Sequence, residues 1–167
     1  MKWYAMRTQV GKEGRSVFLV NSFFRDVNVL FPKRRLSWRK RGEVFDVVKP
    51  LFSGYFFIRA QDKKVRELDF WLRVKRPDIW FVKMGNMIIP VLNEEMQLVQ
   101  QLMCNSDIVE KSNIYKSGDK IEVVSGPLVG LEGIVERYSV RNRRATVKIA
   151  IGGEEKRVEL DAYSIKS

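Results

Sequence analysis

The pattern of apolar residues changes character near residue 105, and this change constrains the fold more than any other feature of the sequence. Before that point helix-like spacings alternate with short β-rich runs, whereas afterwards β-branched runs alternate with glycine-rich turns. Asn105–Asp107 and Lys111–Asn113 interrupt the periodicity between the two regions, as loop residues do. A chain of 167 residues can hold two small domains. We therefore predict a first domain over residues 1–104, a linker over 105–116 and a second domain over 117–167.

The first half is typical of an α+β domain. Three segments have apolar residues at helical spacing: residues 13–24, 62–74 and 93–103. Glu13 is expected on the solvent side of the first helix, and Asn93 is expected to cap the last one. The runs Val44–Val48 and Tyr55–Ala60 predict two strands paired across a turn that contains proline and glycine. The order of elements indicates an antiparallel sheet with helices packed on one face.

The second half is typical of an all-β domain. Four short strands are expected at residues 121–124, 133–138, 145–151 and 156–160, with Tyr163–Ile165 as a candidate fifth strand. A segment of this length with five short strands favours a small barrel, which removes exposed sheet edges. Because its β-branched residues alternate, local preference agrees with the barrel, and we predict that residues 117–167 do not form a helical hairpin.

The composition limits the chemistry that the chain can perform. It has no histidine and one cysteine, Cys104, so the commonest acid–base residue and the common zinc sites are missing. No glycine-rich phosphate loop or clustered carboxylate motif is present. We therefore expect no enzymatic activity, no metal and no cofactor. The chain also lacks a signal-peptide pattern and an apolar run of membrane-spanning length, so we expect a cytoplasmic protein without a membrane partner.

The charge of the chain favours a polyanionic partner. The formal net charge is +11 at pH 7, and residues 1–110 carry 20 Lys and Arg against 12 Asp and Glu. Six cations lie within residues 33–41, around a tryptophan. Such a tract can follow a phosphate backbone while the indole stacks on a base; the alternative is a solvated hairpin loop. The candidate nucleic-acid-binding residues of this tract are Lys33, Arg34, Arg35, Trp38, Arg39, Lys40 and Arg41.

A second cationic segment lies in the predicted barrel. The segment Val140–Arg144 joins two predicted strands, and arginines at a loop tip can fork onto phosphates and guanine edges. The alternative is an ordinary charged turn, because residues 111–167 carry 11 cations and 8 anions and are only mildly basic. The candidates for RNA contact are Arg141, Asn142, Arg143 and Arg144, with Arg137, Lys148 and Arg157 expected nearby.

Two motifs in family order resemble the NusG family. The run Ser117–Val135 resembles the KOW motif of a small SH3-like barrel. The opening Trp3–Ala5, the proline Pro32 and the segments Leu51–Phe57 and Pro77–Gly85 resemble the NusG N-terminal domain, called NGN. Ser53 and Lys12 depart from the family pattern. The basic tract after Pro32 and the arginine-rich barrel loop are similar to the LoaP antiterminators.

The resemblance implies binding partners and site residues. NGN domains dock on the clamp coiled coil of RNA polymerase through an exposed apolar concavity, and they suppress pausing and termination. The matching positions here are Phe52, Tyr55, Phe57, Trp3 and Tyr4; the alternative is that these aromatic residues belong to the core. The resemblance also implies upstream or non-template DNA as a target of the basic tract. The barrel would bind an RNA hairpin in the nascent transcript, a ribosomal protein or a termination factor, and the protein would be a monomer.

Two other functions stay open at the level of the sequence. A ribosome- or RNA-associated KOW protein without a polymerase-docking role would have no exposed apolar pocket in its first half. An enzyme acting on nucleic acid would need a pair of carboxylates facing a groove, and the sequence offers no such pair.

Overall fold

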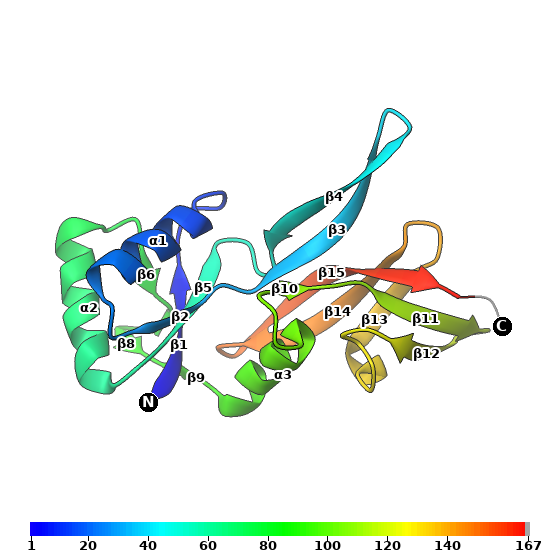
Figure 1. Cartoon of the computed structure of the whole chain (residues 1–167). Helices are drawn as coiled ribbons and strands as arrows, with labels where there is room; N and C mark the ends of the chain where they lie inside the picture. The colour runs from blue at the N-terminus through cyan, green and yellow to red at the C-terminus, as the bar shows by residue number, and fades with distance from the viewer. Residues whose placement is uncertain (166–167) are drawn as a thin grey trace.

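The computed structural model describes residues 1–165 (Figure 1). The N-terminal sheet is antiparallel, in the order β2 (Asn28–Leu30), β5 (Tyr55–Ala60), β1 (Lys2–Arg7) and β6 (Trp80–Phe81). The short strand β9 (Pro90–Val91) also pairs with β1. The central strands β1 and β5 are apolar along most of their length, so both of their faces require cover.

Different elements cover the two faces of this sheet. Helices α1 (Glu13–Phe23) and α2 (Asp62–Lys75) pack on one face, where Tyr4, Met6 and Phe56 are buried with Val20 and Leu68. Helix α3 (Asn93–Met103) belongs to a second buried cluster, on the other side of the sheet. The α+β prediction is confirmed, but the placement of helices on a single face needs correction, since α3 joins the opposite core. Its N-cap position is Leu92 rather than Asn93.

A long antiparallel hairpin projects from the molecule between the two halves (Figure 1). It consists of β3 (Lys33–Lys40) and β4 (Glu43–Pro50), with Arg41 and Gly42 at the tip. The predicted pairing of Val44–Val48 with Tyr55–Ala60 is therefore wrong: β4 pairs with the basic tract, and β5 pairs with β1 and β2. A smaller hairpin joins β7 (Lys83–Met84) to β8 (Met87–Ile88).

The C-terminal half is a strongly curved five-stranded sheet in the order β12-β11-β15-β14-β13. Its strands curl around a core that contains Ile114, Val147 and Leu160. A short 3-10 helix, η1, follows the loop after β12. The element bounds are β11 Ser112–Ser117, β12 Lys120–Ser125, η1 Glu132–Ile134, β13 Val135–Ser139, β14 Arg144–Ile151 and β15 Glu154–Ser164. The predicted β domain extended to residue 167, and residues 166–167 lie outside the described residues.

The predicted linker over residues 105–116 is corrected by the structure. It contains β10 (Ile108–Val109), which pairs parallel to the start of β3, and most of β11. Strand β11 is the fifth strand of the barrel, whereas Tyr163 and Ser164 continue β15. The polar residues that indicated a loop have structural partners: Ser112 is buried, and its Oγ accepts the N–H of Leu128 at 3.0 Å.

The buried cluster beyond the sheet is continuous with the barrel core. It joins Phe57 and Ala5 of the sheet to Leu102 of α3 and to Ile149 and Ile151 of β14. Glu95 of α3 also accepts the N–H of Gly152, at the turn between β14 and β15, at 3.0 Å. The two halves are therefore packed together in this structure.

Gly126 marks the tightest turn of the barrel. Its φ is +99°, and a Cβ there would lie 2.6 Å from the Lys111 carbonyl oxygen and 2.6 Å from Ser112 Cα. Both of these atoms belong to backbone that precedes or forms β11, so they cannot move aside as the end of a flexible side chain would.

We expect Gly126→Ala to destabilise the protein by about 2–4 kcal/mol, because both the φ and the backbone contact become unfavourable. Gly118→Ala is the matched control: its φ is +60°, and no atom lies within 4 Å of its added Cβ. This control should cost about 1–2 kcal/mol. Urea denaturation followed by far-ultraviolet circular dichroism measures both values, and equal losses would contradict the steric account.

Candidate nucleic-acid interface

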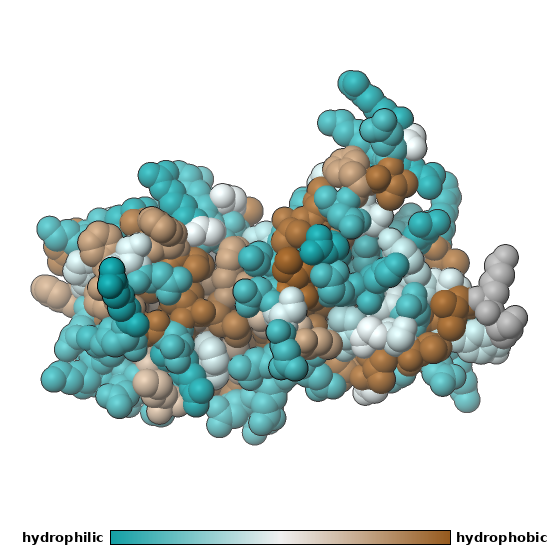
Figure 2. Space-filling model, in the orientation of Figure 1, coloured by the Kyte–Doolittle hydropathy of each residue, from teal (hydrophilic) through white to brown (hydrophobic). Residues whose placement is uncertain are grey.

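The hairpin and the barrel loop that the sequence marks as cationic lie on opposite walls of one cleft. The cleft has a volume of about 510 Å³. It is lined by Ser37, Trp38, Arg39 and Val44 from the hairpin and by Arg141, Asn142, Arg143 and Arg144 from the loop between β13 and β14. Figure 2 shows hydrophilic side chains over the projecting tip of the hairpin, with hydrophobic surface directly beneath them. Two segments about 100 positions apart in the chain thus form a single site.

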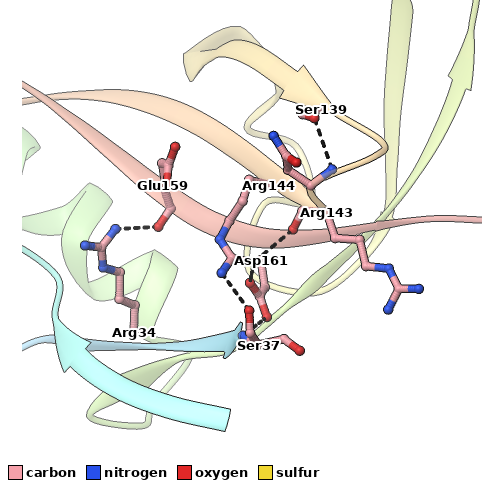
Figure 3. Close-up of polar contacts among 8 residues, drawn as sticks. Arg34, Ser37, Ser139, Arg143, Arg144, Glu159 and Asp161 are labelled. Atoms are coloured by element: carbon pink, nitrogen blue, oxygen red, sulfur yellow. Dashed lines mark hydrogen bonds and ion pairs between the residues drawn. The ribbon is translucent and has the colours of Figure 1, made fainter. Parts of the chain in front are cut away.

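A polar clamp at Ser37 joins the hairpin to the barrel (Figure 3). The Ser37 N–H donates to Asp161 Oδ2 at 2.8 Å, and Arg144 Nη2 donates to the Ser37 carbonyl oxygen at 2.7 Å. Arg144 and Asp161 also form an ion pair with each other, with side chains only 15% and 5% exposed. The clamp satisfies both backbone groups of Ser37 with charged partners, which make stronger hydrogen bonds than neutral ones do.

Burial raises the pKa of Asp161, against the opposing effects of the Ser37 N–H and the Arg144 guanidinium. Between the ordinary carboxyl pKa and this raised value, the folded state holds more protons than the unfolded state. The contribution of Asp161 to stability therefore falls as the pH rises through that window.

Several predicted nucleic-acid ligands have internal partners instead. Arg34 is half-buried and donates to the Glu159 carbonyl oxygen at 2.6 Å, and burial lowers its pKa. Arg35 pairs with Glu110 at 3.0 Å. With Arg144, these residues hold the base of the hairpin against β10 and β15. Their geometry supports a structural role within the chain.

The barrel cations divide in the same way. Arg157 pairs with Glu136 at 2.8 Å, and Lys148 pairs with Glu155 at 3.0 Å. Arg137 is exposed and lies outside the residues that line the cleft. These three residues do not join Arg141 and Arg143 at the loop.

The cations nearest the cleft and the hairpin tip remain exposed. Within residues 1–165, no ion pair involves any member of this group, which consists of Arg39, Lys40, Arg41, Arg141 and Arg143. Asn142 belongs to the loop and donates its N–H to Ser139 Oγ at 3.1 Å. Lys33 lies at the base of the hairpin, with its ammonium 5.6 Å from the centre of the Phe31 ring.

The aromatic residues expected to form an exposed concavity are mostly buried. Phe52 is 4% exposed, Tyr55 7% and Phe57 0%, and only Trp3 is partly exposed. Tyr4 lies on the helix-covered face, where it donates to Asp62 at 2.5 Å. Burial and this hydrogen bond raise the pKa of Tyr4 to about 12. The expectation of a single exposed concavity is wrong for this structure, because alternation along β1 sends Tyr4 away from the other residues.

The barrel strand β15 covers the remaining aromatic residues. Lys156 donates to the Tyr55 hydroxyl at 2.8 Å, and its ammonium lies 4.4 Å from the centre of the Tyr55 ring. Phe52 packs edge-on against Phe57, with ring centres 6.0 Å apart. A cavity of about 180 Å³ is lined by Phe52, Tyr55 and Lys156, among other residues.

Sequence reasoning missed the residues that join the halves. Lys156 begins a predicted strand and Asp161 follows the end of that strand, and neither carried a local signal of a partner far along the chain. Ser37 acts through its backbone, which residue type cannot reveal. One signal was available for Asp161, because it stands between the apolar residues Leu160 and Ala162. All three residues are buried, and a buried carboxylate requires a polar partner.

The fold defines a protein in which an α+β unit is followed by a small β unit. The family profile described as "Transcription termination factor nusG" matches residues 1–100. The chain is 27% identical over 175 residues to the transcription termination/antitermination protein NusG of Thermus thermophilus, covering 96% of this chain and 95% of that relative. The corresponding protein of Deinococcus radiodurans is 28% identical over 182 residues, with 96% of each chain covered.

A solved structure described as "Domain interaction in Thermotoga maritima NusG" has the same fold. Its TM-score is 0.58 at 22% identity, covering 96% of this chain and 93% of that one. On the strength of the family match, this chain belongs to the NusG family of transcription factors. The members of this family are non-enzymatic, which confirms the prediction that the chain is not an enzyme. Among the described residues, no helix has the length and apolar character needed to span a membrane.

Arg144 and Arg143 are adjacent arginines with different expected roles. Figure 3 shows Arg144 directed at Asp161 and Ser37, whereas the guanidinium of Arg143 extends away from them. We expect Arg144→Ala to destabilise the chain by about 3 kcal/mol, because it leaves a buried carboxylate without its cation. The Ser37 amide should also exchange hydrogen faster.

Arg143→Ala is the matched control and should change stability by less than about 0.5 kcal/mol. Chemical denaturation and amide hydrogen exchange measure the two effects. Unchanged protection of the Ser37 amide in Arg144→Ala would show that the clamp does not hold the hairpin.

Proposed function

We propose that this protein is a transcription elongation and antitermination factor that binds RNA polymerase through its first domain and nucleic acid through its barrel. The observation that carries the proposal is the position of Phe52 and Tyr55. They match the docking positions of the NGN domain and lie at the boundary with the barrel, under a strand whose contact with Tyr55 is polar. Opening this boundary would expose part of the apolar cluster that the two halves share, so docking requires a partner that covers it in place of the barrel.

Docking on the clamp coiled coil would require β15 to leave this surface. Phe52 and Tyr55, with Phe57 and Trp3 as neighbours, would then offer apolar contact to the polymerase. Tyr4 would support the sheet from the helix side. Binding that favours one polymerase conformation suppresses pausing without any covalent step.

The barrel would bind an RNA hairpin in the nascent transcript, as in a LoaP-like antiterminator. Arg141 and Arg143 are exposed at the loop tip, where arginine forks can reach phosphate oxygens. The hairpin tip, with Lys40 and Arg41, would face upstream or non-template DNA. A ribosomal protein or a termination factor could use the barrel in place of RNA.

A second candidate function has one observation in its favour. A ribosome- or RNA-associated KOW protein without polymerase docking would need no open aromatic surface, and Phe52 and Tyr55 are buried here. Polymerase binding separates the two candidates, because only the first one requires it.

For polymerase binding, we expect Lys156→Ala to bind purified bacterial RNA polymerase about three-fold more tightly than the unaltered chain. The lost hydrogen bond to Tyr55 corresponds to about 0.5–1.5 kcal/mol of closure. Tyr55→Ala should weaken binding about ten-fold, because it removes an anchoring ring. Lys148→Ala is the control, since its exposed pair with Glu155 lies away from Tyr55. Polymerase affinity that is the same in all the variants would contradict docking through this surface.

For the RNA contact, we expect Arg141→Ala combined with Arg143→Ala to lose transcript-dependent read-through in single-round transcription while keeping its affinity for polymerase. Arg144 is excluded from this variant because its clamp supports the fold. Full RNA-dependent read-through in this double variant would contradict an RNA contact through Arg141 and Arg143. It would favour the alternative that the barrel binds a protein.

A further inference from the structure

The small cavity at the boundary of the two halves has a lining that favours an anion. Its volume is about 180 Å³, and its charged lining residues are Arg34 from β3 with Lys156 and Arg157 from β15. Ser53 and Tyr55, which carry hydroxyl groups, also line it. Among the described residues that form this lining, none is a carboxylate, so the formal charge of the lining is positive.

Arg34 is the cation of this lining that the fold compensates least. Its side chain reaches from the hairpin to β15, where Nη1 donates to the Glu159 carbonyl oxygen at 2.6 Å (Figure 3). Its Nε is buried without a hydrogen-bond partner, and within residues 1–165 no ion pair includes Arg34. Burial lowers the pKa of Arg34, and the positive charge of Arg144 adds to this effect against the opposing charge of Glu159. A half-buried cation in such surroundings is stabilised by an anion at short range.

Lys156 provides the second cation, and its present ion pair is exposed. Its ammonium donates to the Tyr55 hydroxyl at 2.8 Å and pairs with Glu154 at 3.0 Å. The Glu154 side chain is 66% exposed and lies outside the lining, so this pair is weak and an oxyanion can compete with it. Arg157, by contrast, donates both Nε and Nη2 to Glu136, at 2.8 and 3.2 Å, so its charge is already engaged.

We propose that the cavity binds a small oxyanion of the phosphate class, held between the Arg34 guanidinium and the Lys156 ammonium. A tetrahedral oxyanion has oxygens in several directions, so one ion can accept hydrogen bonds from both cations and from the Ser53 hydroxyl. Ligands of drug size occupy pockets of about 300–1,000 Å³, so this cavity favours a free ion or a terminal phosphate group over a whole nucleotide. Neither polymerase nor a polynucleotide is needed for this binding.

A bound oxyanion would join the two halves of the molecule. Arg34 belongs to the hairpin of the first half, whereas Lys156 belongs to the barrel strand β15. Because the ion contacts both cations only while the halves are packed together, its binding stabilises that arrangement, and the effect increases with the concentration of the ion. The level of a small anion would then set how readily the halves separate.

The test uses the full-length chain and isothermal titration calorimetry at constant ionic strength without magnesium. The probes are potassium phosphate, potassium pyrophosphate and adenosine triphosphate, with potassium chloride as the blank. We expect phosphate or pyrophosphate to bind with a dissociation constant on the order of 1 mM or lower. Tighter binding of adenosine triphosphate than of either ion would support the site and identify a terminal phosphate group as its ligand. Equal or weaker binding of the nucleotide would identify the free ion.

Substitutions at the two cations and at the competing carboxylate should change the affinity in opposite directions. Lys156→Met keeps the length of the side chain and removes its charge, so it should weaken binding about ten-fold. Arg34→Gln should weaken binding to a similar extent. Glu154→Gln should strengthen binding about three-fold, because it removes the carboxylate that competes for the Lys156 ammonium. A gain in affinity cannot result from loss of the fold, so Glu154→Gln tests the site even if Arg34→Gln loosens the hairpin.

Lys148 and Glu155 provide the matched controls. They form an exposed ion pair at 3.0 Å, and both lie outside the lining of the cavity. Lys148→Met and Glu155→Gln make the same changes of charge and should each leave the affinity within about two-fold. Phosphate stabilises many proteins non-specifically, so thermal melting serves only to show that each variant is folded. No binding of any of the three probes, or equal changes in the control and cavity variants, would overturn the proposal.

Discussion

The clamp of Asp161 and Arg144 on the Ser37 backbone is the interaction on which the relation between the two halves depends. A strand edge normally offers its N–H and C=O groups to another strand. Here β10 pairs only with the start of β3. Further along β3, the side chains of Asp161 and Arg144 make the hydrogen bonds to the backbone N–H and C=O of Ser37 that a neighbouring strand would otherwise make. These two charged side chains hold the hairpin against the barrel without further strand pairing. The hairpin therefore lies beside the β13–β14 loop, whose arginines also line the cleft.

The packing of the two halves also buries the face of the central sheet that α1 and α2 do not cover. Alternation along β1 and β5 buries one set of side chains under α1 and α2 and the other set against α3 and the barrel. Apolar burial favours the closed arrangement, and the contact of Lys156 with Tyr55 adds a polar interaction to it. The proposed docking surface and the packing of the two halves therefore compete for the same aromatic side chains.

Local pattern predicted the elements that depend on local preference and failed where long-range contacts decide. The three helices and most barrel strands followed from apolar spacing. Strand β11 was missed because the polar residue Ser112 is typical of a loop. In the fold its hydroxyl is buried and accepts the N–H of Leu128, a contact that the local sequence does not reveal. Glu13 was expected in solvent, yet it is 3% exposed and accepts the N–H groups of Gly11 and Gly54 at 2.9 and 2.8 Å. The cationic residues of the candidate site were visible in the sequence, but their division into clamp and cleft depends on Asp161, far along the chain.

The short connection between α3 and β11 has a consequence for any state in which the halves separate. Eight residues lie between Met103 and Ser112, and β10 occupies two of them. If β10 releases β3, this tether reaches at most about 28 Å. A barrel joined by so short a linker stays near the first domain, at an effective concentration on the order of millimolar. Whatever the barrel holds would then be delivered to the neighbourhood of the first domain rather than sampled from bulk solution.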